Sequence, residues 1–314
     1  MGSPQVSTRL PTHKNVLAAQ RRLRGRIHTT PILSSRSLNE MAGVDLLFKC
    51  ESLQRSGSFK YRGALNATLA LPRLQRKLGL ATHSSGNHGA AVAAVARSLG
   101  LTATVVVPRN ASKFKRQAIR RYGGHIVPCG KTLLSRERRL REVLADSGAV
   151  YIPPYDHPAI IAGQGTAGLE ILQQCPGADE LWVPVGGGGL AAGTVLAAGA
   201  QVQVVGAQPR LARDAHVSMR RGSRQPPMPP VTVADGLRTG LGTLNFAVLH
   251  GYQLPIKLVS EAEIIAAQKL AMSCLKILVE PSSAVPLAAL LKYGPVQGGS
   301  RKVVVVITGG NVEL

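Results

Sequence analysis

Four consecutive glycines, Gly186 to Gly189, are the part of this 314-residue chain with the clearest chemical use. In VPVGGGGLAAGT (183–194) they follow an apolar run that favours a strand and precede a run of small residues that favours a helix. Because glycine has no Cβ, backbone N–H groups can approach a phosphate there, and the start of the following helix adds its positive end. The pattern therefore indicates a phosphate site.

A flexible turn is the alternative interpretation of the four glycines, but such a turn costs backbone entropy on folding. Phosphate binding is favoured for that reason. The loop is not a dinucleotide fingerprint, because no Asp or Glu ends a second strand at the right distance, and it is not an ATP loop, because no Gly-Lys-Ser/Thr follows.

Lys60 stands at the predicted start of a helix in SLQRSGSFKYRGALNA (52–67), after the turn or capping residues Ser56, Gly57 and Ser58. An amine near a helix N-terminus tends toward a lowered pKa, which suits Schiff-base chemistry. Taken in isolation, Lys60 is better interpreted as a solvated surface lysine. The other motifs of the chain must decide between the two.

A second candidate anion site lies in THSSGNHGAAVAAVARSLG (82–100), where a predicted strand leads into an alanine-rich helix. Hydroxyl groups, an amide and free backbone N–H groups gather at the helix start and suit a substrate carboxylate. The residues are Ser84, Ser85, Gly86, Asn87 and His88. A Ser/Asn cap without a ligand explains the motif equally well when it is considered alone.

The elements that must position these groups alternate, from residue 80 onward, between short β-branched runs and helical stretches, a pattern typical of parallel strands joined by crossover helices. The first series predicts strands at 102–108 and 125–128, helices at 112–123 and 133–148, and then a strand in AVYIP. The second predicts strands at 180–185, 201–209 and 302–310. Two sheets are implied, with a Pro/Gly-rich loop at 222–236 between parts of the second.

Composition limits the classes of function. The net charge is +22, from 38 basic and 16 acidic residues, so nucleic-acid binding has to be considered. The basic residues are dispersed and aromatics make up only 4%, which favours a solvated basic surface and no nucleic-acid partner. No apolar run approaches the ~20 residues of a membrane helix, and four cysteines without a C-x-x-C pair fit a reducing cytoplasm.

Together, four motifs in their order and spacing resemble the threonine dehydratase and serine racemase family of pyridoxal 5'-phosphate (PLP) enzymes. The motifs are S-x-S-F-K-x-R-G-A, S-S-G-N-H-G, G-G-G-G-L and a final T-G-G-N. The resemblance covers nearly the whole chain and includes HTTPILSSRSLNE (28–40), ADGLRTGLG (234–242) and VEPSSAV (279–285). It implies an α/β fold of two open, twisted, largely parallel sheets flanked by helices, like tryptophan synthase β.

The resemblance also implies roles for single residues. Lys60 would hold PLP as a Schiff base, with Phe59 beside the ring and Asn87 hydrogen-bonded to the 3-hydroxyl. Gly186, Gly187, Gly188, Gly189 and Leu190 would hold the phosphate, and Thr308 would sit at the pyridine nitrogen. A neutral partner there leaves that nitrogen unprotonated, which favours prompt loss of a β-leaving group. Lys60 would then remove the α-proton, and loss of water would give a 2-oxo acid and ammonia.

The substrate residues implied are Ser84, Ser85, Gly86, Asn87, His88 and Arg136. Ser85 matches the serine that acts opposite the lysine in the racemases, so amino-acid racemisation with dehydratase side activity is the alternative function. Arg136, in SRERRLRE (135–142), has two open interpretations. It belongs to a solvated basic helix face, or it binds the second carboxylate of a substrate such as 3-hydroxyaspartate.

A divalent cation is doubtful. Relatives bind Mg²⁺ or Ca²⁺ through a Glu, a carbonyl and an Asp, but in GAQPRLARDAH (206–216) Gln208 replaces the usual Glu, and only Asp214 remains. Losing one charged oxygen ligand weakens a hard-cation site.

The expected organisation is a large PLP-binding domain from residues 1–55 and 151–314 and a small domain from 56–150, in a homodimer expected from the family alone. A non-catalytic, basic nucleic-acid-binding protein on the same fold is a distant alternative, which the intact Lys60, Asn87 and glycine loop argue against.

Overall fold

Two sheets organise the chain in the computed structural model, which describes residues 9–313 except 85, 230 and 300. The six-stranded sheet has the order β1-β2-β10-β7-β8-β9, and all of its neighbours are parallel except β1 and β2. Its strands are β1 (Ile32–Ser34), β2 (Asp45–Cys50), β7 (Glu180–Pro184), β8 (Gln203–Pro209), β9 (Ile256–Val259) and β10 (Lys302–Ile307).

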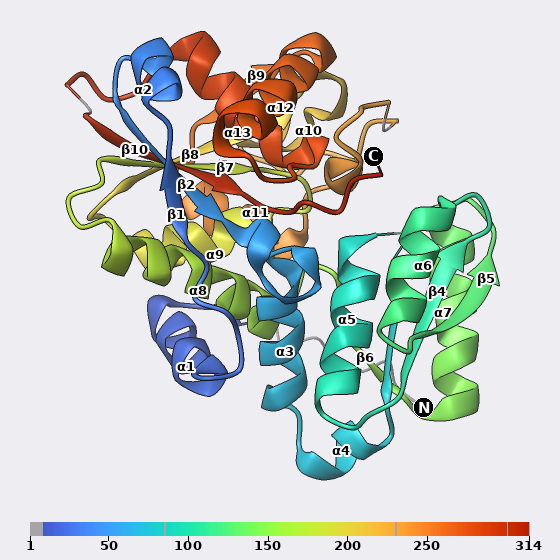
Figure 1. Cartoon of the computed structure of the whole chain (residues 1–314). Helices are drawn as coiled ribbons and strands as arrows, with labels where there is room; N and C mark the ends of the chain where they lie inside the picture. Colours follow the sequence, from blue (N-terminus) through green and yellow to red (C-terminus); the bar gives the residue numbers. More distant parts are fainter. Residues whose placement is uncertain (1–8, 85, 230, 300, 314) are drawn as a thin grey trace.

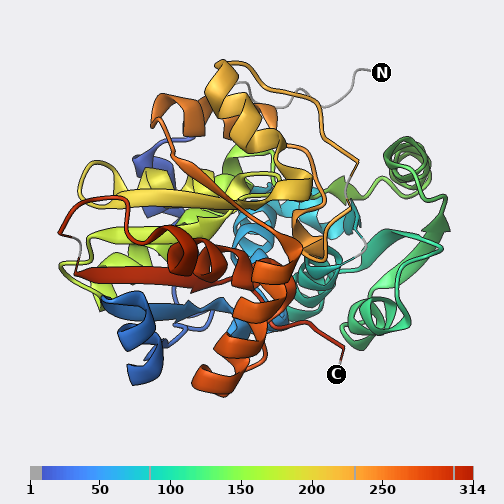
Figure 2. The ribbon, with the colours of Figure 1, turned by 90° about the horizontal axis from the view of Figure 1, so that it is seen from above.

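The second sheet has four parallel strands in the order β5-β4-β3-β6. They are β3 (Leu80–His83), β4 (Ala103–Pro108), β5 (His125–Cys129) and β6 (Val150–Tyr151). The expected α/β fold of two largely parallel sheets is confirmed. Figure 2 shows the unit that contains the four-stranded sheet lying to one side of the larger sheet.

Helices cover both sheets (Figure 1). They are α1 (His13–Leu23), α2 (Arg36–Ala42), α3 (Lys60–Ala70), α4 (Arg73–Lys77), α5 (Asn87–Ser98), α6 (Lys113–Arg121), α7 (Leu133–Ser147), α8 (Pro158–Gln174), α9 (Gly189–Ala198), α10 (Asp214–Arg221), α11 (Thr243–Gly251), α12 (Glu261–Leu275) and α13 (Pro281–Tyr293). Short 3₁₀ turns are η1 (Glu51–Leu53), η2 (Arg55–Gly57), η3 (Arg210–Ala212) and η4 (Asp235–Leu237). None of these helices is long and apolar enough to cross a membrane.

The central strand β10 explains why the larger sheet needs helices on both faces. Val303 and Val305 pack with α12 and α13, whereas Val304 and Val306 pack with α8 and α9. Successive side chains of a strand point to opposite faces, so an uninterrupted apolar strand must be covered twice. In the smaller sheet α5 packs against one face and α7 against the other.

Helix α3 joins the two units, because it packs against α8 of the larger one and against α5 of the smaller one. The small sheet runs from residue 80 to Tyr151, close to the predicted small domain, but the division into domains at residues 56 and 150 stays a prediction. The expected loop at 222–236 has no strand or α-helix in its described residues and ends in η4.

Candidate active site

A cavity of about 450 Å³ brings together the predicted cofactor and substrate residues that the structure describes. Ser85 lies outside the described residues. One wall comes from the end of β3, the start of α5 and the first turn of α7, and the other from the glycine loop, the end of β10 and the start of α13. The predicted residues on its lining are Phe59, Lys60, Ser84, Gly86, Asn87, His88, Arg136, Gly186 to Gly189, Leu190 and Thr308.

Lys60 is the first residue of α3, as expected, and its Nζ donates a hydrogen bond to the Pro154 carbonyl oxygen at 2.9 Å. Nζ also lies 5.0 Å from the centroid of the Phe59 ring. Burial lowers the pKa of Lys60 to about 8, while the charge of Glu280 acts in the opposite direction. An amine with this pKa is available in its neutral, nucleophilic form near neutral pH.

The backbone before Lys60 is tied to the end of β10. The Phe59 N–H donates to the Thr308 carbonyl oxygen at 3.0 Å, and Ser58 forms a bridge with Gly309. Ser56 and Gly57 both have left-handed backbone angles, with φ of 63° and 73°. Only glycine adopts this region without cost, so the turn at Ser56 needs support from outside.

Asn311 supplies part of that support. Its Nδ2 donates to the Ser56 carbonyl oxygen and to Asn87 Oδ1, both at 2.9 Å. The other end of the Asn87 side chain donates to both carboxylate oxygens of Glu280, at 2.8 and 2.9 Å. The Asn87 carboxamide is therefore held in one orientation at the cavity wall.

Glu280 is a buried carboxyl group, 5% exposed, and burial raises its pKa, although the Asn87 hydrogen bond and the charges of Lys115 and Lys60 oppose the rise. Glu280 lines the cavity, where it interacts with the charge of Lys60 and accepts hydrogen bonds from Asn87. Glu280 lies in the motif VEPSSAV, for which the sequence implied no role. Its signal in the sequence is an acidic residue directly after the apolar residues 277–279.

The glycine loop is closed in by its neighbours on the side where a Cβ would stand. A Cβ on Gly187 would overlap the Tyr155 ring, and one on Gly188 would lie 2.7 Å from Leu241 Cδ1. Gly188 also has φ of 90° and caps α9, which begins at Gly189. The first N–H groups of α9 have no partner within the helix, so they are free to bind an anion.

A Gly187→Ala substitution tests this cradle. The new methyl group must displace the Tyr155 ring or shift the loop, which costs about 1–3 kcal/mol in a packed site. We expect the affinity for PLP to fall at least tenfold, measured by equilibrium dialysis of the cofactor. The matched control is Gly251→Ala, at the end of α11, where a Cβ would meet no atom within 4 Å. Equal affinities for PLP in the two variants would contradict the phosphate role.

Thr308 is 2% exposed and lies directly after β10. Its hydroxyl is 2.8 Å from Ser283 Oγ, which in turn bonds both the carbonyl oxygen and the N–H of Gly309. Either hydroxyl of the Thr308–Ser283 pair can be the donor. Ser283 has a single hydroxyl hydrogen, so it donates either to the Gly309 carbonyl oxygen or to Thr308 Oγ1. Only in the second case is the Thr308 hydrogen free to point into the cavity as a neutral donor.

Both histidines of the cavity are held neutral. Burial lowers the pKa of His83 to about 4 and that of His88 to about 3, and the nearby charges of Arg136 and Lys60, respectively, lower them further. His88 Nε2 bonds the Ile152 carbonyl oxygen at 3.0 Å, which makes Nε2 the protonated nitrogen. The Nε2 hydrogen of His88 is therefore used in the bond to Ile152, the residue that follows β6. On this wall of the cavity, the first backbone amides of α5 remain available to bind an anion.

Four cationic side chains besides Lys60 line the cavity: Lys115, Lys131, Arg136 and Arg238. Lys115 forms an ion pair with Asp235 across the cavity, and Arg238 donates to the Thr232 carbonyl oxygen at 2.5 and 2.8 Å. Arg136 Nε is buried and has no hydrogen-bond partner among the described residues. A guanidinium in that state can take a carboxylate. Sequence reasoning missed Lys115, Asp235 and Arg238, although ADGLRTGLG contains two of them.

The candidate metal residues lie apart from this cavity. Gln208 Nε2 donates to Asp214 Oδ1 at 3.1 Å, and Asp214 Oδ2 accepts the Leu241 N–H at 2.8 Å. The two side chains therefore satisfy each other. Within the described part of the chain, no group of three or more His, Cys, Asp or Glu residues could hold a metal ion.

The cavity fits PLP on features of its own: a buried amine, a cradle of glycines that side chains would fill, and a buried hydroxyl pair. Comparison with known proteins agrees. The family model "Pyridoxal-phosphate dependent enzyme" matches residues 23–309.

Two curated relatives and one solved structure are similar over nearly their whole length. The β-hydroxyaspartate dehydratase of Paracoccus denitrificans is 42% identical over 97% of this chain and 98% of the relative. The serine racemase of Arabidopsis thaliana is 41% identical over 96% and 93%. The structure of maize serine racemase aligns with a TM-score of 0.94 and 39% identity, over 98% of this chain and 95% of that one.

Proposed function

The chain belongs to the family of pyridoxal-phosphate dependent enzymes, and on that premise we propose that it eliminates water from a small β-hydroxy amino acid. The products are a 2-oxo acid and ammonia. One observation carries the proposal: a single cavity joins the buried amine of Lys60, the glycine cradle and the unpaired guanidinium nitrogen of Arg136.

In this proposal Lys60 would bind the cofactor covalently, Gly186 to Leu190 would hold its phosphate, and Thr308 would meet its ring nitrogen. Phe59 would lie beside the ring, and Asn87 would bond the 3-hydroxyl. The cofactor supplies an electron sink for the bond between Cα and its hydrogen. The tight packing behind the loop and the bonds that Glu280 and Asn311 make to Asn87 support this arrangement, because both fix the groups before ligands arrive.

The chain's own residues carry out the proton transfer and the binding. With the substrate bound, the Lys60 amine would accept the proton from Cα. A pKa of about 8 for Lys60 suits a base that works near neutral pH. The electron pair left at Cα would break the bond from Cβ to its hydroxyl, and the proton that Lys60 took from Cα would go to that hydroxyl, so that it leaves as water. Hydrolysis of the unsaturated product then releases the 2-oxo acid and ammonia.

The substrate is bound by groups on the other wall. The first amides of α5, with Ser84 and Gly86 before them, take the α-carboxylate. Arg136 takes a second carboxylate through two parallel hydrogen bonds, which makes 3-hydroxyaspartate a better substrate than serine or threonine. The 42% identity to a β-hydroxyaspartate dehydratase supports this choice.

Amino-acid racemisation is the second candidate function. It is favoured by the relatives named serine racemase and by the resemblance that assigns Ser85 to the face opposite Lys60. A hydroxyl there returns a proton to Cα from the other side before the β-bond breaks. The two functions share the residues that line the described cavity, so one assay must measure both products.

The test is a substrate panel with the PLP-saturated protein: L-serine, L-threonine and both 3-hydroxyaspartates, with 2-oxo acid, ammonia and D-amino acid measured together. We expect equal amounts of oxo acid and ammonia, fastest from one 3-hydroxyaspartate. D-Serine accumulating faster than pyruvate would favour the racemase instead. Absence of both kinds of product from all four compounds would contradict the proposed function.

We further propose a homodimer in the cytoplasm, with no nucleic-acid partner. The family expectation supports the dimer, and the four free cysteines, three of them buried, support a reducing compartment. Sedimentation velocity tests the dimer: a single species with the mass of one chain would contradict it.

A further inference from the structure

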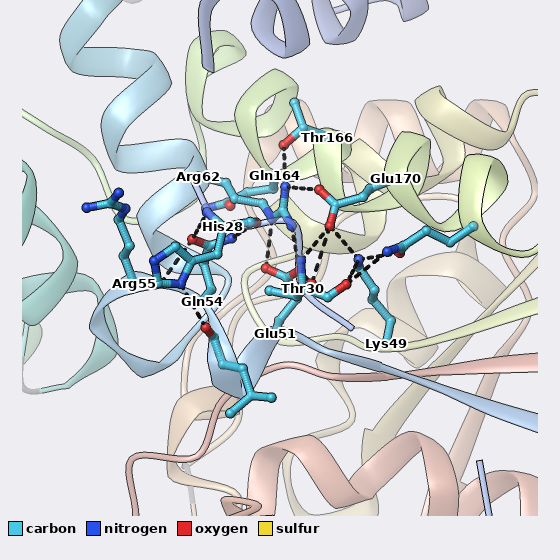
Figure 3. A network of polar contacts seen from close by, with 12 residues as sticks. His28, Thr30, Lys49, Glu51, Gln54, Arg55, Arg62, Gln164, Thr166 and Glu170 are labelled. Carbon is cyan, nitrogen blue, oxygen red and sulfur yellow. Dashed lines mark hydrogen bonds and ion pairs between the residues drawn. The ribbon is translucent and has the colours of Figure 1, made fainter. Parts of the chain in front are cut away.

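A network of charged side chains is buried between β2, η1, α3 and α8 (Figure 3), and none of the four lines the cavity. The side chains of Lys49, Glu51 and Arg62 are 0% exposed, and that of Glu170 is 13% exposed. Two cations and two carboxylates thus balance one another in the interior. None of the proposed chemical steps uses any of them.

Arg62 is the centre of this network. Its Nε and Nη2 donate to the two oxygens of Glu51, both at 2.7 Å, and its Nη1 donates to Glu170 Oε2 at 3.0 Å. Burial disfavours the charge of Arg62, but Glu51 and Glu170 outweigh it and raise the pKa of Arg62. The planar fork is therefore permanently charged and fixed in direction.

The network has a second arm that does not reach α3. Lys49 Nζ donates to Glu170 Oε1, to Gln174 Oε1 at 2.6 Å and to the Thr30 carbonyl oxygen at 2.8 Å. This arm ties β2 and the segment before β1 to α8. Of the four charged side chains, Arg62 is the one that belongs to α3, the helix that starts at Lys60.

The position of Arg62 relates it directly to Lys60. The two residues are in the first turn of α3, two positions apart, so a shift of that turn moves both. The acceptor of the Lys60 amine, Pro154, lies four residues before α8, to which Glu170 belongs. The contact between Arg62 and Glu170 therefore joins α3, which carries the Lys60 amine, to α8, which follows Pro154 in the chain.

Arg62 adds a charged contact to two neutral ones between α3 and α8, in which the Gly63 N–H donates to Gln164 Oε1 at 3.1 Å and Asn66 Nδ2 donates to the Ala159 carbonyl oxygen at 2.6 Å. The helices approach at Gly63 and Gly163, where a Cβ on Gly163 would lie 2.7 Å from Gly63 Cα. Small residues allow a close approach but supply few interlocking side chains to fix the sliding position. A buried ion pair is often replaceable by apolar residues without loss of stability, so the fixed direction of the Arg62 fork, which reaches both Glu51 and Glu170, is the property that a geometric role would use.

We propose that Arg62 is a positioning residue that holds the first turn of α3 against η1 and α8 and so places the Lys60 amine at the Pro154 carbonyl. The inference rests on the proposed function in one respect, the role of Lys60 as the amine that binds the cofactor. The placement itself is a property of the cofactor-free chain.

The test compares Arg62→Lys with Lys49→Met. The first variant keeps the charge but loses the fork, and the second removes a buried cation from the arm that does not reach α3, leaving Glu170 paired with Arg62. Two quantities are measured besides the midpoint of thermal unfolding. One is the titration midpoint of the Lys60 amine in cofactor-free protein, from pH-dependent acetylation and peptide mass spectrometry, and the other is the Kd for PLP.

We expect Arg62→Lys to raise the Lys60 midpoint from about 8 toward the ordinary lysine value and to weaken PLP binding roughly tenfold. Lys49→Met should lower the midpoint of thermal unfolding at least as much as Arg62→Lys does. It should nevertheless leave the titration midpoint of Lys60 and the Kd for PLP near those of wild type. If Arg62→Lys does not fold, Glu51→Gln, which keeps the shape of the partner, takes its place with the same expectation.

A variant of Arg62 or Glu51 that is less stable but has a wild-type Lys60 midpoint and PLP affinity would overturn the proposal. Equal shifts in Lys49→Met would also overturn it, because they would make the effect a general consequence of lost stability. Failure of the proposed function looks different: wild-type protein would bind PLP without involving Lys60, while the acetylation titration would still report how Arg62 places the amine.

Discussion

Replacing Lys60 with alanine is expected to lower the rate of 2-oxo acid release by on the order of 10³-fold or more, because it removes the covalent attachment of the cofactor and the base at Cα together. The rate is measured with PLP in excess, so that weaker cofactor binding does not account for the loss. The matched control is Lys113→Ala, an exposed lysine that likewise begins a helix, α6, and whose loss should leave the rate within about twofold.

The Lys60→Ala variant should not fail by unfolding. In the folded, cofactor-free chain the pKa of Lys60 is lowered by burial to about 8, below the ordinary value of 10.5. Its charge therefore costs stability below pH 8, and this cost disappears as the pH rises from 8 to 10.5, where the unfolded chain binds more protons. The variant should be at least as stable as wild type at pH 7, with a smaller advantage at pH 10. A rate close to wild type would contradict the role of Lys60.

Replacing Arg136 with methionine should lower kcat/KM for 3-hydroxyaspartate by on the order of 100-fold, since a carboxylate loses a charge-assisted, two-bond contact worth several kcal/mol. The kcat/KM for L-serine, which has no second carboxylate, should change much less. Arg139→Met is the control, because Arg139 is on the same helix, pairs with Glu142 and is 44% exposed.

The ratio of the two substrates distinguishes the interpretations of Arg136. An equal fall for 3-hydroxyaspartate and L-serine would mean that Arg136 supports the wall of the cavity and does not select the substrate. No fall with either substrate would return Arg136 to the solvated face of α7. The buried Nε of Arg136, which has no partner among the described residues, favours a selective loss with the dicarboxylic substrate.

Much of the fold followed from local patterns. The family, the two largely parallel sheets and PLP as cofactor are confirmed. Apolar runs such as 302–310 predicted strands because both faces of a parallel sheet are covered, and Gly148 marked the end of α7, where it adopts φ of 66°. The boundaries were less accurate. The helix expected at 112–123 spans Lys113–Arg121, because Ser112 lies outside it as the cap, where its Oγ accepts the Lys115 N–H.

The parts of the site that sequence reasoning missed depend on contacts between distant segments. Glu280 and Asn311 act on Asn87 from 193 and 224 positions away, and no local periodicity signals such a meeting. Arg62 was quoted as part of a motif, yet its burial against Glu51 and Glu170 is visible only once α3 and α8 are packed. The four glycines were easier to predict, because they act through their backbone N–H groups and glycine is the residue type that lets the backbone approach a ligand closely.

The most direct test of the central claim is to reduce the PLP-loaded protein with borohydride and find the modified residue by peptide mass spectrometry. Lysine is the residue type that such a cofactor modifies, and Lys60, Lys115 and Lys131 all line the cavity. The account predicts the mass of the reduced cofactor on the peptide that contains Lys60 and its absence from the other two. Modification of Lys115 or Lys131, or no stable modification, would contradict the assignment of this cavity as the catalytic site built around Lys60.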